Sequence, residues 1–178
     1  FLVAAPSLSG SLLRIPFSAW VDTTGGKKPF LVLLFLSIVG MTGLFITLNS
    51  FYPARMTHSF YPLILLLGVL CGCGIATFSV GIGQVAYWYP KGRQGGALGT
   101  YAGIGNLAPG IFTLLLPLAL VTMGLARSYL AWLAFLAAGT VVYAVIGRNA
   151  WYFQLVGRGV PALEAKTAAS ERGQEIFP

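Results

Sequence analysis

Long apolar stretches alternate with short polar segments along the 178-residue chain. A helix crosses the ~30 Å hydrocarbon core of a bilayer with about 20 predominantly apolar residues. Most of these stretches reach that length and stay apolar around the whole helix, whereas a helix in a soluble core shows a regular polar face. We therefore predict five membrane-spanning helices, over residues 2–21, 30–48, 61–89, 95–122 and 129–146.

Composition supports the membrane assignment, with 57% hydrophobic and 8% charged residues. Soluble domains carry about a quarter charged residues, so most of this surface is expected to face lipid. Residues 148–178 are richer in Pro, Ala, Lys, Glu and Ser. The sequence thus predicts an all-α membrane protein with a transmembrane bundle over residues 1–147. Residues 148–178 are predicted to be a cytoplasmic linker or tail, with a short amphipathic helix near residues 162–172.

The net charge of +7 is spread over short loops rather than gathered on one face, which argues against nucleic acid as a partner. If five spans alternate, most basic residues share one side: Lys27, Lys28, Lys91, Arg93, Arg148, Arg158, Lys166 and Arg172. The other side has only Arg55 and Arg127. The positive-inside rule places the basic side and the tail in the cytoplasm of a multi-pass protein of the cell (inner) membrane. Because Phe1 already lies in an apolar run, we expect the chain to be part of a larger protein.

Arg14 lies about eight residues before Asp22, and ~12 Å of helix rise places its side chain near the middle of a bilayer. A charge at that depth costs at least about 2.5–3.5 kcal/mol on insertion scales, which makes it a candidate functional residue. Ser7, Ser11 and Ser18 share its helix face, forming a polar stripe suited to a wet cavity. The planar guanidinium fork matches the oxygens of nitrate or a carboxylate. The alternative is that Arg14 extends to the interface or pairs with another helix.

The fourth predicted span carries a second candidate surface. Gly99, Gly103, Asn106 and Gly110 recur at steps of four, three and four, and so lie on one helix face. Because glycine has no side chain, a ligand or a second helix can approach the backbone here. Gly105 lies within the same segment. The Asn106 amide can donate a hydrogen bond to an anion. A tight helix-packing seam with an interhelical hydrogen bond from Asn106 explains the pattern equally well.

The remaining chemistry is sparse. Phe78 either lines a cavity or packs in the core. Cys71 and Cys73 lie two apart on a predicted helix, point in different directions, and are expected to be packing residues rather than a disulfide or metal site. No nucleophile–base pair is visible, so an enzyme, a metal site or a cofactor is not expected. The predicted spans contain no central Asp or Glu, which leans toward anion exchange rather than proton coupling.

Two segments carry a family resemblance. Residues 18–28 resemble the loop between helices two and three of the major facilitator superfamily: Asp22 matches its acid and Lys27 one of its basic positions, while Thr23 and Ser18 depart from the pattern. Residues 87–110 resemble the nitrate signature of the nitrate/nitrite porter (NarK-like) family. The resemblance implies that the five spans are helices 2–6 of a twelve-helix transporter, in its N-terminal half. Helix one and the C-terminal half are then partners outside this chain.

The same resemblance implies that Arg14, Asn106 and Phe78 contact the bound anion. Gly103, on the same helix face as Asn106, is a further candidate for substrate binding. The other candidates, for helix packing or gating, are Gly99, Gly105, Gly110, Asp22 and Lys27. The expected function is transport of nitrate and/or nitrite by alternating access, through anion exchange or proton-coupled symport, with this piece inactive by itself. A transporter of small organic carboxylates and a non-transporting helical scaffold are the alternatives.

Overall fold

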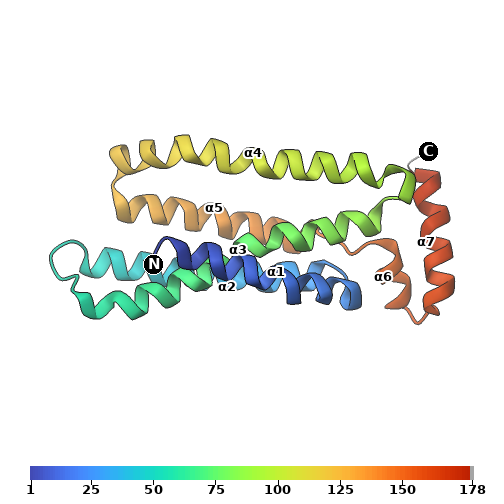
Figure 1. The fold of residues 1–178 in the computed structure, drawn as a ribbon, viewed down its shortest axis with the longest axis horizontal. Helices are drawn as coiled ribbons and strands as arrows, with labels where there is room; N and C mark the ends of the chain where they lie inside the picture. Colours follow the sequence, from blue (N-terminus) through green and yellow to red (C-terminus); the bar gives the residue numbers. More distant parts are fainter. Residues whose placement is uncertain (177–178) are drawn as a thin grey trace.

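The computed structural model describes residues 1–176, and its regular elements are all helices (Figure 1). The long helices are α1 Ala4–Thr24, α2 Lys27–Phe51, α3 Tyr61–Trp88, α4 Lys91–Met123 and α5 Leu125–Ile146. A single turn, η1 His58–Phe60, precedes α3, and the short α6 Trp151–Val156 and α7 Ala162–Ile176 follow α5. The all-α prediction is confirmed. The last two residues of the predicted 148–178 segment, 177 and 178, lie outside the described part.

Within residues 1–176, four helices are long and apolar enough to cross a membrane: α2, α3 with its preceding turn, α4 and α5. The predicted first span forms α1, whose 21 residues would extend ~32 Å. It falls outside this set of four because its serines and Arg14 dilute the apolar character that the other helices have. The same polar residues that mark α1 as a candidate site therefore also weaken its hydropathy signal.

Local sequence explains where two helices begin. The helix α4 starts at Lys91, four residues before the predicted start, because Pro90 is an N-cap with an extended backbone (φ −64°, ψ 153°) and its carbonyl begins the helix. Gly124 alone separates α4 from α5, with φ +78°. That left-handed backbone is readily available only to glycine, which makes the one-residue connection possible.

α3 is the centre of the bundle, since it packs extensively against both α1 and α2 and also contacts α4. The buried core between α1, α2 and α3 contains Val21, Leu33, Cys73, Ala76 and Val80. In contrast, α4 has no buried residue and lies with α5 along one side of the molecule (Figure 1).

The backbones of α1 and α3 approach each other closely. A β-carbon added at Gly72 would overlap the carbonyl oxygen of Pro6 and the hydroxyl of Ser9. The Ser9 hydroxyl donates a hydrogen bond of 3.0 Å to the carbonyl oxygen of Val69. A small residue and an interhelical hydrogen bond at one crossing are typical of packed membrane helices, and together they fix α1 on α3.

Candidate functional site

Arg14 is half-buried on α1, and its Nε atom is buried without a hydrogen-bond partner in the described part of the chain. A buried guanidinium donor that lacks an acceptor costs free energy, so this nitrogen favours binding of an acceptor from outside residues 1–176. Ser7 and Ser11 of the same stripe are exposed, and Ser18 is half-buried. The polar face of α1 is therefore partly open rather than fully packed against α3.

Phe78 on α3 lies against α4. Its ring stacks on Tyr101, with 5.5 Å between the centroids, and the Tyr101 hydroxyl donates a hydrogen bond of 3.4 Å to the Phe78 carbonyl. A β-carbon added at Gly105 would lie only 2.9 Å from Cε2 of Phe78. Gly105 thus faces α3 and makes room for the Phe78 ring, which is half-buried between the two helices.

The predicted glycine face of α4 is open. A β-carbon added at Gly99, Gly103 or Gly110 would meet no atom within 4 Å, and Asn106 between them is exposed. Within residues 1–176 this face therefore forms no packing seam. Asn106 donates no side-chain hydrogen bond to another described residue, so both its amide and the adjacent backbone are accessible.

The structure thus brings Phe78 into contact with α4 but does not join Arg14 to Asn106 by a hydrogen bond within the described residues. The two residues lie on α1 and α4, each of which packs against α3. The candidate site is spread over three helices, with Phe78 on the one between.

Tyr101 was not among the predicted site residues. Besides stacking on Phe78, its hydroxyl lies where a β-carbon of Gly81 would be. One sequence signal is available: Tyr101 and Gly105 are four apart, so they share the α4 face that meets α3. Tyr101 fixes the position of Phe78 rather than reaching the open glycine face.

Asp22, near the end of α1, and Lys27, the first residue of α2, take part in contacts with distant segments. The Tyr87 hydroxyl at the end of α3 donates a hydrogen bond of 3.1 Å to Oδ1 of Asp22. The backbone N–H of Lys27 donates one of 2.8 Å to Oδ1 of Asn149, whose Nδ2 donates to the carbonyl of Thr24 at 3.3 Å. The α1–α2 loop is therefore held by a side chain that lies just after α5.

A second polar contact joins the same end of the bundle. Gln84 on α3 accepts a hydrogen bond of 2.8 Å from the Tyr143 hydroxyl on α5 and donates one of 2.9 Å to the carbonyl of Arg148. A β-carbon added at Gly26 would lie 2.8 Å from the Cβ of Gln84. Gly25 and Gly26 let the α1–α2 loop come close to Asn149 and Gln84. The hydrogen bonds at this end can therefore join α1, α3 and the segment after α5.

Cys71 and Cys73 on α3 are free thiols, half-buried and buried respectively. No group of three or more His, Cys, Asp or Glu residues within residues 1–176 could hold a metal ion. The described residues that could meet a ligand are instead the arginine, the amide and the aromatic ring discussed above.

A bundle of long apolar helices is typical of a polytopic membrane protein. The chain belongs to the Major Facilitator Superfamily, whose family description matches residues 1–176. This family comprises transporters, which agrees with the predicted class of protein.

Individual relatives include the nitrate/nitrite transporter NarU of Salmonella typhimurium, 35% identical over 117 residues, covering 66% of this chain and 24% of NarU. The probable nitrate transporter NarT of Staphylococcus carnosus is 29% identical over 150 residues, covering 82% of this chain and 34% of NarT. The probable nitrate/nitrite transporter NarK2 of Mycobacterium tuberculosis is 29% identical over 155 residues, covering 86% and 36%. The chain thus spans about a quarter to a third of the length of these relatives. No solved structure matches it significantly.

Proposed function

We propose that the transporter containing this chain moves nitrate and/or nitrite across a membrane by alternating access, with Arg14 as the principal anion contact of this part. The observation that carries the proposal is the buried Nε of Arg14, which has no acceptor among residues 1–176 and lies on a helix with a polar face. The names of the relatives, all nitrate or nitrite transporters, support the substrate.

The chemistry of the anion fits a guanidinium. Nitrate and nitrite are small planar oxyanions, and a guanidinium presents parallel N–H donors in a fork of matching geometry. Bringing the anion to Arg14 neutralises a charge that costs about 2.5–3.5 kcal/mol near the middle of a bilayer. The anion in turn replaces its lost hydration with charge-assisted hydrogen bonds, so each charge lowers the cost of burying the other.

Phe78 and the open face of α4 supply the rest of this chain's share of the site. The Phe78 ring, fixed by Tyr101, gives a flat apolar wall beside a planar anion. Asn106 and Gly103 are exposed on α4 and offer an amide donor and an accessible backbone. For these groups to meet one anion with Arg14, α4 and α1 must converge on the same cavity when the remainder of the transporter is in place.

The helix α4 also carries the features needed to bend. Pro109 lies inside α4 next to Gly110, and a proline within a helix removes a backbone hydrogen bond. The Thr113 hydroxyl donates a hydrogen bond of 2.7 Å to the Pro109 carbonyl one turn before it. We propose that α4 bends or slides here as two halves rock around the anion.

The proposed coupling is exchange of one anion for another, with proton-coupled symport as the second possibility. The four apolar spans contain no Asp or Glu that could carry a proton through them. The excess of basic residues in the α1–α2 and α3–α4 connections and in the tail after α5 supports the proposal that these segments face the cytoplasm, with the helices in the cell membrane.

Counterflow in proteoliposomes tests the substrate and the coupling together. The full-length transporter is loaded with unlabelled nitrate, and entry of labelled nitrite or nitrate is measured with and without a proton gradient. We expect entry driven by internal nitrate without a gradient, and weak competition by acetate or formate. Equal exchange of small carboxylates would assign an organic anion instead, and the absence of any anion flux would favour a helical scaffold.

A further inference from the structure

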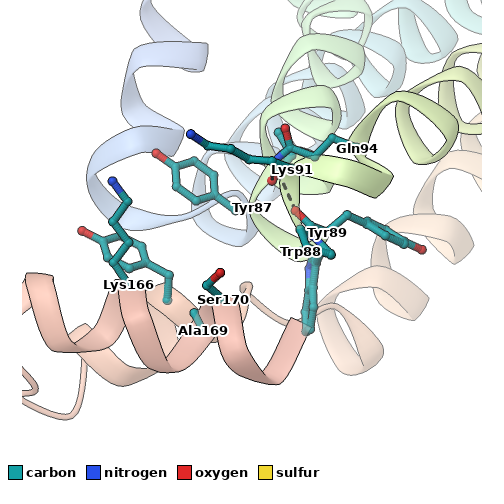
Figure 2. Close-up of a pocket in the computed structure, with 11 residues that line it drawn as sticks. Tyr87, Trp88, Tyr89, Lys91, Gln94, Lys166, Ala169 and Ser170 are labelled. Atoms are coloured by element: carbon teal, nitrogen blue, oxygen red, sulfur yellow. Dashed lines mark hydrogen bonds between the residues drawn. The ribbon is translucent and has the colours of Figure 1, made fainter. Parts of the chain in front are cut away.

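A cavity of about 540 Å³ lies away from the candidate anion site, at the corner where α3 passes into α4. Figure 2 shows the α7 helix closing one side of it. Its lining includes Tyr87, Trp88, Lys91, Tyr152, Lys166 and Ser170. The volume is in the range of small-molecule sites, and its walls combine aromatic rings with a few polar groups, as such sites do.

The α7 side of this cavity is held in place by contacts of α7 with α6 and with the α3–α4 corner. The Arg172 guanidinium on α7 lies 4.1 Å above the centroid of Trp151, and Trp151 meets Trp88 edge to face at 5.6 Å. A β-carbon added at Gly173 would touch Cδ of Pro90 at 3.5 Å, and Ala165 is completely buried. These contacts dock α7 on α6 and on the α3–α4 corner, so the position of Lys166 is set by the fold.

The cavity is electropositive. Its two charged lining residues, Lys91 and Lys166, come from α4 and α7, and no lining residue within the described chain is an acid. Both lysines are exposed, and no carboxylate in residues 1–176 forms an ion pair with either. In Figure 2 both side chains extend toward the side of the cavity where the Tyr87 hydroxyl lies. The Tyr87 hydroxyl itself donates a hydrogen bond of 3.1 Å to Oδ1 of Asp22, which does not line the cavity.

We propose that this cavity binds a phosphate-bearing anion. Two ammonium groups from different helices extend toward one side of the cavity and can donate to phosphate oxygens, and lysine binds phosphate as a point charge. The Ser170 hydroxyl lines the same cavity and is a further donor. The rings of Tyr152 and Trp88 supply an apolar wall for the rest of the ligand. Phosphate esters in solution and acidic phospholipid headgroups share this chemistry.

The position of the cavity bears on the source of the phosphate. It lies at the end of the apolar α3 span, beside Trp88, Tyr89 and Trp151. Trp and Tyr gather at the level of lipid headgroups. The headgroup of an acidic phospholipid can therefore reach the cavity from the bilayer, while a soluble phosphate ester would enter from the aqueous side.

The test uses the full-length transporter in nanodiscs of neutral phosphatidylcholine. One arm adds glycerol 3-phosphate in solution, and the other uses discs that also contain phosphatidylglycerol; retained ligand is counted by native mass spectrometry, and binding is followed by tryptophan fluorescence. We expect saturable binding in at least one arm. The K91Q/K166Q double variant should weaken it at least about tenfold, a loss of about 1.4 kcal/mol.

Two control variants separate the effect of charge from that of packing. K91R/K166R keeps both charges and should retain binding. Arg127→Gln removes a cation from the opposite end of α5 and should leave binding unchanged. Binding in the soluble arm alone identifies a phosphate ester, and binding only in the acidic discs identifies a lipid headgroup. Absence of binding in both arms, or equal binding by K91Q/K166Q with an unchanged unfolding temperature, overturns the proposal. Because none of these readouts measures nitrate flux, the result is independent of the proposed transport function.

Discussion

The rings of Phe78 and Tyr101 stack with their centroids 5.5 Å apart, and the Tyr101 hydroxyl occupies the space beside Gly81 where a β-carbon would lie. This contact holds α4 against α3 at the level of the candidate anion site. The position of the Phe78 ring thus depends on Gly81 having no β-carbon, and a substitution of Gly81 can test this dependence.

Gly81→Ala should destabilise the bundle by about 1–3 kcal/mol, the usual cost of overpacking, because the new methyl overlaps the Tyr101 hydroxyl. Thermal unfolding of the purified full-length protein in detergent measures the effect. Gly99→Ala is the matched control, since its β-carbon meets open space, and it should be neutral or slightly stabilising.

The double variant Gly81→Ala with Tyr101→Phe should recover much of the loss, because removing the hydroxyl makes room for the methyl. A coupling energy of about 0.5–3 kcal/mol is expected for two residues in contact. If the two changes simply add, the Tyr101 hydroxyl does not occupy this space in the protein.

Arg14→Lys should reduce nitrate uptake by the full-length transporter at least about tenfold, which corresponds to about 1.4 kcal/mol. Lysine keeps the positive charge but lacks the planar fork that binds two oxygens of one anion. Initial rates of labelled nitrate entry into proteoliposomes provide the measurement. Arg127→Lys makes the same chemical change at an exposed position on α5 and should transport like wild type. Normal uptake by the Arg14 variant would remove this residue from the proposed site.

Asn149→Ala should cost about 1–3 kcal/mol of stability, because it leaves the Lys27 N–H without its acceptor and the Thr24 carbonyl without a donor. The unfolding temperature should fall, and hydrogen exchange in the α1–α2 loop should accelerate. Asn49→Ala removes an exposed amide from α2 and should change neither quantity. Equal behaviour of the two variants would show that the Asn149 contacts add nothing to the loop.

Arg172→Ala should loosen α7 from α6, since the guanidinium lies 4.1 Å above the Trp151 ring. A cation–π contact of this kind contributes about 0.5–2 kcal/mol. Limited proteolysis between α6 and α7, near the exposed Gly159, should become faster. Arg172→Lys retains a cation for the ring and should lie between wild type and the alanine variant. Unchanged cleavage in both variants would mean that other contacts hold α7 in place.

The helical spans were predictable because bilayer thickness fixes the length of each apolar stretch, and the structure keeps these boundaries to within a few residues for most helices. The start of α4 was placed too late, at residue 95 rather than Lys91. The basic residues Lys91 and Arg93 favoured a loop in the sequence, but Pro90 caps the helix and both residues lie in its first turn. Hydropathy thus marks where the apolar span begins, whereas the cap marks where the helix begins.

Contacts between distant segments were not predictable in the same way. Asn149 binds the Lys27 backbone across 122 residues of sequence, and no local pattern encodes that pairing. The periodic face of Gly99, Gly103 and Gly110 was evident from spacing alone. Whether that face is packed or open depends on neighbouring helices, and the structure leaves it open within residues 1–176.

The bare face of α4 also has a consequence for friction. A neighbouring helix that moves along Gly99, Gly103 and Gly110 meets backbone at these three positions, so Asn106 is the one residue of this periodic set whose side chain has to adjust. Such a surface therefore presents few energy barriers to sliding. A face of leucine side chains would instead present a barrier at each turn of the helix.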